Sequence, residues 1–303
     1  MIVTCGEALV DLVPDQRSGK LLYRPVLGGS LYTVALGIAR MGGQSGYLWE
    51  LSRDALGQSL LDALQSAGVD CAAATLSERA TPVAVVDTSG SEPRYAIADP
   101  DQVMSDTRLG PLPRTTRCLH LGSAVLAKEP VGTRLEALAA TAPLVTIDYN
   151  VRAPSIVDRR AYAARLRRIA QSSGIVKAST VDIDLIGEGE AQAYMRALVD
   201  EGATMAILTA ADAGAFAFTR EASAFAPSCA FEIDDPVGAG DSFMAAVLST
   251  LQSDGALSHD TLMRLSQTKL KALLEHGHRA AAFTCRHQGA VMPSMADLVG
   301  ELG

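Results

Sequence analysis

Cysteine is scarce in this chain, and its spacing follows no pattern. The five cysteines are odd in number, and no two of them form a C-x-x-C pair. This excludes a disulfide framework and a zinc ribbon, and it favours a reducing cytoplasm. No segment reaches about 18 uninterrupted apolar residues, and the opening stretch MIVTCGEALV has no basic region before its apolar residues. We therefore expect neither export nor a membrane span.

Positive charge is also in short supply. The formal net charge is −8, so we expect no binding to nucleic acid or to anionic membranes. An acidic protein that handles anions must bind them locally. Only 5 residues are lysine, against 21 arginines, and Asn150 is the single asparagine. A motif that uses lysine or asparagine therefore has a low chance of arising at random.

Short β-type runs alternate with helical patterns along the whole chain. The runs include RCLHLGS, PLVTIDYN, GIVKAS and MAILTA. Between them, apolar residues return at helical spacing in stretches such as 131–141, 158–170 and 188–201. This alternation predicts an α/β fold with a central, mainly parallel sheet and helices on both faces. With 303 residues, the chain suits one domain over residues 1–303.

Two segments break the alternation, at residues 7–27 and about 82–99. Each reads as strand, turn, strand, with period-2 patterning and no intervening helix. They could pair as a small separate sheet that acts as a lid over the large domain. The alternative is that both are simple edge hairpins.

Polar residues follow several of the predicted strands. In an open parallel sheet, ligands collect at the carboxyl ends of the strands. These ends carry Asp148, Asn150, Lys177, Ser179 and Thr209. Turns after strands are polar in any case, and that reading is sufficient for Ser179 and Thr209. It is weaker for Asn150 and Lys177, because the chain uses both residue types so rarely.

The stretch DDPVGAGDSF, residues 234–243, joins a glycine-containing loop to an amphipathic helix. The first N–H groups of such a helix lack intrahelical partners, and glycine allows close approach, so an anion site is expected here. Asp241 would lie in the first helical turn, where the helix dipole favours the ionised form that accepts a proton. Aspartate is also a plain helix-start signal, so this reading stays open. No P-loop and no complete dinucleotide fingerprint occurs in the sequence.

Five motifs stand in the order of a known family. They are GEALVDLVP, GGSLYTVALGIARMGG, DYNVRAP, VKASTVD and DDPVGAGDSF. The ordered set resembles the PfkB/ribokinase family of carbohydrate kinases, and most closely its fructokinase branch. The resemblance implies a ribokinase-like three-layer α/β/α domain with a small β-sheet lid. It also implies an ATP-dependent sugar kinase in which Asp241 is the general base for the attacking hydroxyl.

The same resemblance assigns further residues by position. The transferring phosphoryl group would be held by the backbone of Gly238, Ala239 and Gly240. The sugar would be bound by Asp11, Gly28, Gly29, Thr33, Asn150 and Arg152, with Arg94 close by. The nucleotide would be bordered by Lys177, Ser179, Thr209, Ala211, Gly214, Cys285 and Gly289. Mg²⁺ would lie near Asp182 through water, and K⁺, where it is bound, near Asp235, Val237, Thr284 and Gly289.

Four positions depart from the family pattern. Thr33 stands for an asparagine, Pro236 for a threonine, Ala211 for a glycine and Asp182 for a glutamate. None of them touches the base or the anion site, so they bear on substrate identity more than on reaction type.

Three functions remain open at this point. D-fructose is the first expected substrate. A 2-keto-3-deoxygluconate kinase is the alternative, because Arg152 and Arg94 could bind a sugar-acid carboxylate. From another class comes a catalytically weak sugar- or nucleotide-binding protein. Relatives often pair through their lids, so the resemblance also implies a homodimer.

Overall fold

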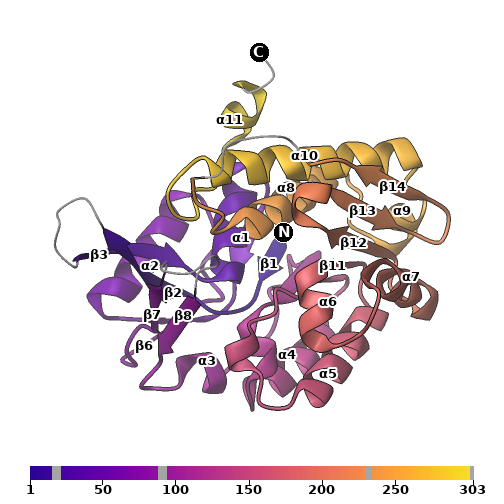
Figure 1. The fold of residues 1–303 in the computed structure, drawn as a ribbon. Coiled ribbons are helices and arrows are strands. Elements are labelled where there is room, and N and C mark those ends of the chain that lie inside the picture. The colour runs from indigo at the N-terminus through magenta and orange to yellow at the C-terminus, as the bar shows by residue number, and fades with distance from the viewer. Residues whose placement is uncertain (16–21, 88–93, 229–233, 301–303) are drawn as a thin grey trace.

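A large β-sheet organises the chain (Figure 1). The computed structural model describes residues 1–15, 22–87, 94–228 and 234–300. The strands of this sheet are β1 (Ile2–Thr4), β4 (Ser45–Tyr47), β9 (Cys118–Gly122), β10 (Val145–Asp148), β11 (Ile175–Ser179), β12 (Met205–Thr209), β13 (Ala215–Phe218) and β14 (Ser223–Ala226). Their order is β14-β13-β12-β11-β10-β9-β1-β4. Neighbouring strands from β4 to β12 are parallel, and the pairs β12–β13 and β13–β14 are antiparallel, so the predicted mainly parallel sheet is confirmed.

Helices cover both faces of this sheet, as the alternation predicted (Figure 1). The helices are α1 (Ser30–Arg40), α2 (Ala55–Ser66), α3 (Val103–Asp106), α4 (Val131–Ala139), α5 (Arg159–Gln171), α6 (Thr180–Ile186), α7 (Ala191–Glu201), α8 (Ala239–Ser253), α9 (His259–Met263), α10 (Gln267–Cys285) and α11 (Met295–Gly300). One buried cluster joins α1, α8 and α10 to the sheet, and a second joins α4, α5 and α7 to its other face. The burial of apolar surface in these two layers is the main force that holds the sheet between them.

A second sheet comes from the two segments that broke the alternation. Its strands are β2 (Leu9–Asp15), β3 (Leu22–Gly28), β7 (Val83–Asp87) and β8 (Arg94–Ala98), in the order β3-β2-β7-β8. We call it the lid sheet. It is separate from the large sheet, which confirms the predicted lid and excludes simple edge hairpins (Figure 1). A two-stranded sheet of β5 (Glu50–Ser52) and β6 (Thr75–Ser77) lies between the lid segments in sequence.

The register of the lid sheet gives it two distinct faces. Asp11 pairs with Val26 on β3 and with Ala84 on β7, so these side chains share one face. The side chain of Val26 lies 3.2 Å from the point where a side chain on Gly289 would begin. This face is therefore turned toward the C-terminal loops. The opposite face carries Leu12 and Val85, and it is more exposed.

None of the helices in the described ranges is long and apolar enough to span a bilayer.

Candidate active site

Asp241 lies in the first turn of α8, which begins at the carboxyl edge of the large sheet. Gly238 is the N-cap of this helix, with φ 82°, a conformation that glycine adopts readily. The N–H of Ala239 donates to the carbonyl of Pro236 at 3.2 Å, so this group of the predicted anion site is already engaged. The expectation that Pro236 lies clear of the anion site is therefore wrong. The N–H groups of Gly240 and Asp241 come next in the first turn, where no intrahelical acceptor exists for them. One of the three backbone groups predicted for the anion site, that of Ala239, is therefore bonded within the chain.

Asp241 is held by a residue that the sequence motifs did not single out. The hydroxyl of Ser30, the first residue of α1, donates to Asp241 Oδ1 at 2.6 Å. Asn150 Nδ2 in turn donates to Ser30 Oγ at 2.8 Å. Asn150 has φ 37°, in the left-handed region that asparagine visits more readily than most residues. Asn150 was predicted to bind the sugar, and here its amide binds the Ser30 hydroxyl that holds Asp241, the predicted general base.

The environment of Asp241 alters its acidity. Burial raises the pKa of Asp241 above its ordinary value, and the Ser30 hydroxyl, Arg152 and Lys177 only partly offset this. We expected the helix dipole to favour the ionised form. The net direction is the opposite, because burial outweighs the local stabilisation.

Lys177 forms a buried ion pair beneath the helix terminus. Its ammonium donates to Asp148 Oδ2 at 2.7 Å. The same nitrogen lies 3.5 Å from the point where a side chain on Gly240 would begin. Burial opposes the charge of Lys177, but Asp148, together with Asp182 and Asp241, raises its pKa, so the ammonium stays protonated. The chain thus has a fixed positive charge next to the backbone of the predicted anion site.

The residues predicted for the sugar gather on the lid side of Asp241. The Asp11 carboxylate lies against Gly28, where a side chain would collide with it. Gly29 has φ 105° and abuts the carbonyl of Glu7, so glycine is needed there as well. Thr33 is buried one turn into α1, on the helix that carries Ser30. The side chain of Arg94 lies outside the described residues.

Buried carboxyl groups gather in this part of the site. Burial, with Asp241 and Asp235 nearby, raises the pKa of Asp11 to about 6, against the opposing effect of Arg152. Burial also raises the pKa of Glu7 to about 7, and Asp241 adds to the effect. No local pattern marks Glu7, since its burial arises from tertiary packing.

Ser179 and Asp182 have a structural part that was not predicted. They form a capping box at the start of α6, in which each side chain binds the other residue's N–H. Asp182 also accepts from the N–H of Val151 at 2.7 Å. The sequence S-x-x-D was a visible signal for this cap. These bonds occupy the Ser179 hydroxyl, as the polar-turn reading allowed, and both carboxylate oxygens of Asp182 accept hydrogen bonds.

The predicted adenine-side turn follows β12. Thr209 ends this strand opposite Ala215, and a 3₁₀ turn over Ala211–Ala213 leads to Gly214. Ala211 has φ 42°, a strained conformation for alanine that costs about 1–2 kcal/mol. The family's usual glycine would avoid this strain.

The loop before α8 and the loop after α10 are tied together by Asp235. Its carboxylate accepts from the N–H of Val237 at 3.0 Å and of Gly289 at 2.8 Å. The carbonyl of Cys285 accepts from the N–H of Asp235, and the hydroxyl of Thr284 donates to the carbonyl of Val291. The structure therefore brings the oxygen-bearing residues predicted for K⁺ into one cluster.

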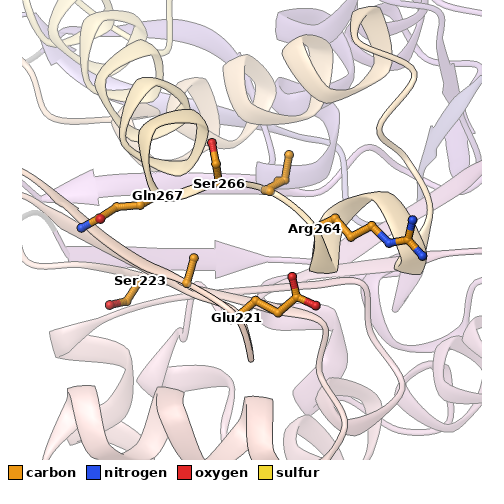
Figure 2. A pocket seen from close by; sticks show the side chains of 7 residues that line it. Glu221, Ser223, Arg264, Ser266 and Gln267 are labelled. Atoms are coloured by element: carbon orange, nitrogen blue, oxygen red, sulfur yellow. The ribbon is translucent and has the colours of Figure 1, made fainter.

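A separate pocket lies at the far end of the sheet (Figure 2). Its volume is about 420 Å³, and Glu221, Ser223, Arg264 and Gln267 are among its lining residues. Ser223 pairs with Phe218, at the opposite end of β13 from Ala215. Since Ala215 pairs with Thr209 at the carboxyl edge, this pocket lies away from Asp241.

Comparison with known proteins decides the family. The profile described as "pfkB family carbohydrate kinase" matches residues 1–296. The chain belongs to this family. This carbohydrate kinase is 30% identical to a fructokinase of Rhizobium leguminosarum bv. trifolii over 279 residues, which cover 89% of this chain and 86% of the relative.

Solved structures share the fold of this PfkB kinase. A double mutant of fructokinase from Vibrio cholerae O395, described with fructose, ADP and potassium ion, superposes with a TM-score of 0.85 at 23% identity and covers 100% of this chain and 98% of its own. An aminoimidazole riboside kinase from Salmonella enterica gives a TM-score of 0.82 at 23% identity and covers 100% of both chains. The ribokinase-like fold is thus confirmed, and it accommodates different sugar substrates.

Proposed function

We propose that this PfkB sugar kinase transfers the γ-phosphoryl group of ATP to D-fructose and forms fructose 6-phosphate. The observation that carries the proposal is the position of the Asp241 carboxylate, in the first turn of α8 and beside the Lys177 ammonium. The fructokinase relative at 30% identity supports fructose as the acceptor.

The proposed reaction is an in-line displacement. Asp241 takes the proton from the 6-hydroxyl of the sugar as this O–H bond breaks. The sugar oxygen forms a bond to the γ-phosphorus, and the bond from that phosphorus to the β-phosphate oxygen breaks to release ADP. Phosphoryl transfer depends mainly on alignment and charge neutralisation. The α8 terminus and Lys177 would supply both without a P-loop.

Metal ions would complete the charge balance. Within the described residues, no group of three or more His, Cys, Asp or Glu side chains is arranged to hold a metal. This fits a Mg²⁺ that is carried by the nucleotide phosphates, keeps its waters and meets Asp182 only through them. Mg²⁺ would neutralise charge on the transferring phosphates. The Asp235 cluster offers carboxylate and carbonyl oxygens, which suit K⁺.

The charge of the sugar site separates the two sugar candidates. The carboxyl groups of Glu7, Asp11 and Asp241 meet here, and Arg152 is the described cation that acts on all three. A sugar acid would add a further carboxylate to this site. Juxtaposed like charges cost several kcal/mol, so a neutral sugar is favoured over 2-keto-3-deoxygluconate.

We expect a substrate panel to show this preference. In a coupled assay of ADP release over hexoses, pentoses and keto-sugar acids, kcat/KM for D-fructose should exceed that for the sugar acid by about tenfold or more, because of the like-charge penalty. An Arg152→Gln variant is the matched control, since removal of this cation should widen the gap. Turnover with the sugar acid alone would overturn fructose as the substrate.

We also propose that residues 1–303 form one ribokinase-like domain that pairs as a homodimer in the cytoplasm. The exposed face of the lid sheet is mainly apolar, with Asp87 at the end of β7. Leu12, Pro14, Tyr23, Pro25, Val85 and Ala96 share it by register. A second copy could cover this face and close the exposed strand edges.

Light scattering tests the dimer. At micromolar concentration we expect twice the 31.7 kDa of the chain. Val85→Asp should shift the mass to that of a monomer, because a charge would then be buried in the interface. Thr75→Asp, on the exposed β6 strand, is the control and should leave the mass unchanged. A parent protein at the monomer mass would contradict the proposal.

A further inference from the structure

The hydroxyl of Ser30 donates its hydrogen to one acceptor, Asp241 Oδ1. A hydroxyl carries a single donor hydrogen and two acceptor lone pairs. Asn150 Nδ2 donates to Ser30 Oγ and occupies one lone pair, while the hydrogen points to Asp241 Oδ1. These two hydrogen bonds, which we call the relay, therefore run in one direction. The amide of Asn150 donates to the hydroxyl of Ser30, and this hydroxyl donates to the carboxylate of Asp241.

The relay distinguishes the two oxygens of Asp241. Oδ1 accepts from Ser30, at the short distance of 2.6 Å that is typical of a hydroxyl bound to a charged oxygen. In the described part of the chain, Oδ2 accepts no side-chain hydrogen bond. Ser30 is itself buried, on a helix N-terminus that packs against α8, so its hydroxyl cannot turn to solvent instead.

We propose that Ser30 is a positioning residue for the general base, which holds Asp241 Oδ1 as an acceptor and leaves Oδ2 as the atom that takes the sugar proton. The inference rests on the proposed function, in which Asp241 is the base. It adds the identity of the accepting oxygen and the residues that select it, and it explains how contacts 211 residues apart in sequence set up one carboxylate.

Several charged groups face Asp241 besides Ser30. Arg152 and Lys177 favour its ionised form, whereas Glu7, Asp11 and Asp148 repel it. The hydroxyl of Ser30 donates to none of these three carboxylates. A change at Ser30 therefore acts on the titration of Asp241 directly and leaves the other groups in place.

The test is the pH dependence of kcat/KM for fructose. Ser30→Ala removes a hydrogen bond to the ionised carboxylate, so the acid limb should move up by about one pH unit, and the activity at high pH should fall because the carboxylate is no longer held in place. Ser30→Thr keeps a hydroxyl and should return the limb toward the parent. Ser242→Ala is the matched control. This neighbouring buried serine donates to the carbonyl of Ala280, so its loss should lower Tm without moving the limb.

Each outcome bears on one claim. The Ser30 inference is overturned if Ser30→Ala leaves the acid limb unchanged, or moves it to lower pH as expected if a protonated Asp241 donates to Ser30. It is also overturned if Ser242→Ala moves the limb equally. An active Asp241→Asn enzyme would instead overturn the proposed function, whatever happens at Ser30.

Discussion

Asp241→Asn should lower kcat by about 100-fold or more, because an amide cannot accept the proton that leaves the sugar hydroxyl, and general-base assistance is typically worth 10²–10⁴-fold. Asparagine keeps the shape of aspartate, and its carbonyl oxygen can still accept from Ser30. Sugar and nucleotide binding should therefore persist. Steady-state kinetics give the change in kcat, and calorimetric titration with fructose and with ATP gives binding.

The stability of Asp241→Asn shows whether a loss of kcat comes from unfolding. Folding raises the pKa of Asp241, so the folded state binds its proton more tightly than the unfolded state does. Such a carboxyl costs stability as the pH rises from its unfolded pKa through its folded pKa, and this cost is fully present above the latter. A neutral asparagine avoids the cost, so Asp241→Asn should be at least as stable as the parent at neutral pH. If kcat fell by less than tenfold with intact binding, Asp241 would not be the general base. If the parent protein were itself only weakly active, the binding-protein alternative would be favoured.

Much of the fold could be predicted because burial imposes periodic patterns. The parallel strands are short apolar runs with buried residues on both faces, as in β9 and β10. The lid strands alternate with period 2, because one face of that sheet packs toward the protein and the other is exposed.

The site was predictable only where local chemistry marks it. Asp241 and Lys177 stood out because a helix start and a rare residue type are visible in a short stretch. Ser30 did not, because its contact with Asp241 exists only in the tertiary fold.

Lys177→Met should be the most destabilising single change at the site. The Lys177 and Asp148 side chains are only 5% and 2% exposed, and Asp148 Oδ1 has no hydrogen-bond partner among the described residues. Without the ammonium, Asp148 would be a buried carboxylate with no counter-charge. Removal of one partner from a buried pair costs about 3–5 kcal/mol. Urea unfolding, with the m-value checked for constancy, measures this loss.

The double variant Lys177→Met/Asp148→Leu separates stability from catalysis. Replacement of a buried ion pair by apolar side chains of similar size is often neutral or stabilising, so the double variant should recover most of the free energy of unfolding. Its kcat should stay low, by about 100-fold, because the positive charge beside Gly240 is still missing where the phosphoryl group would carry its charge. Lys269→Met, which removes an exposed pair with Asp254, is the control and should change neither quantity much. If activity returned together with stability, Lys177 would serve the fold alone, and the helix terminus of α8 would have to neutralise the phosphoryl group without it.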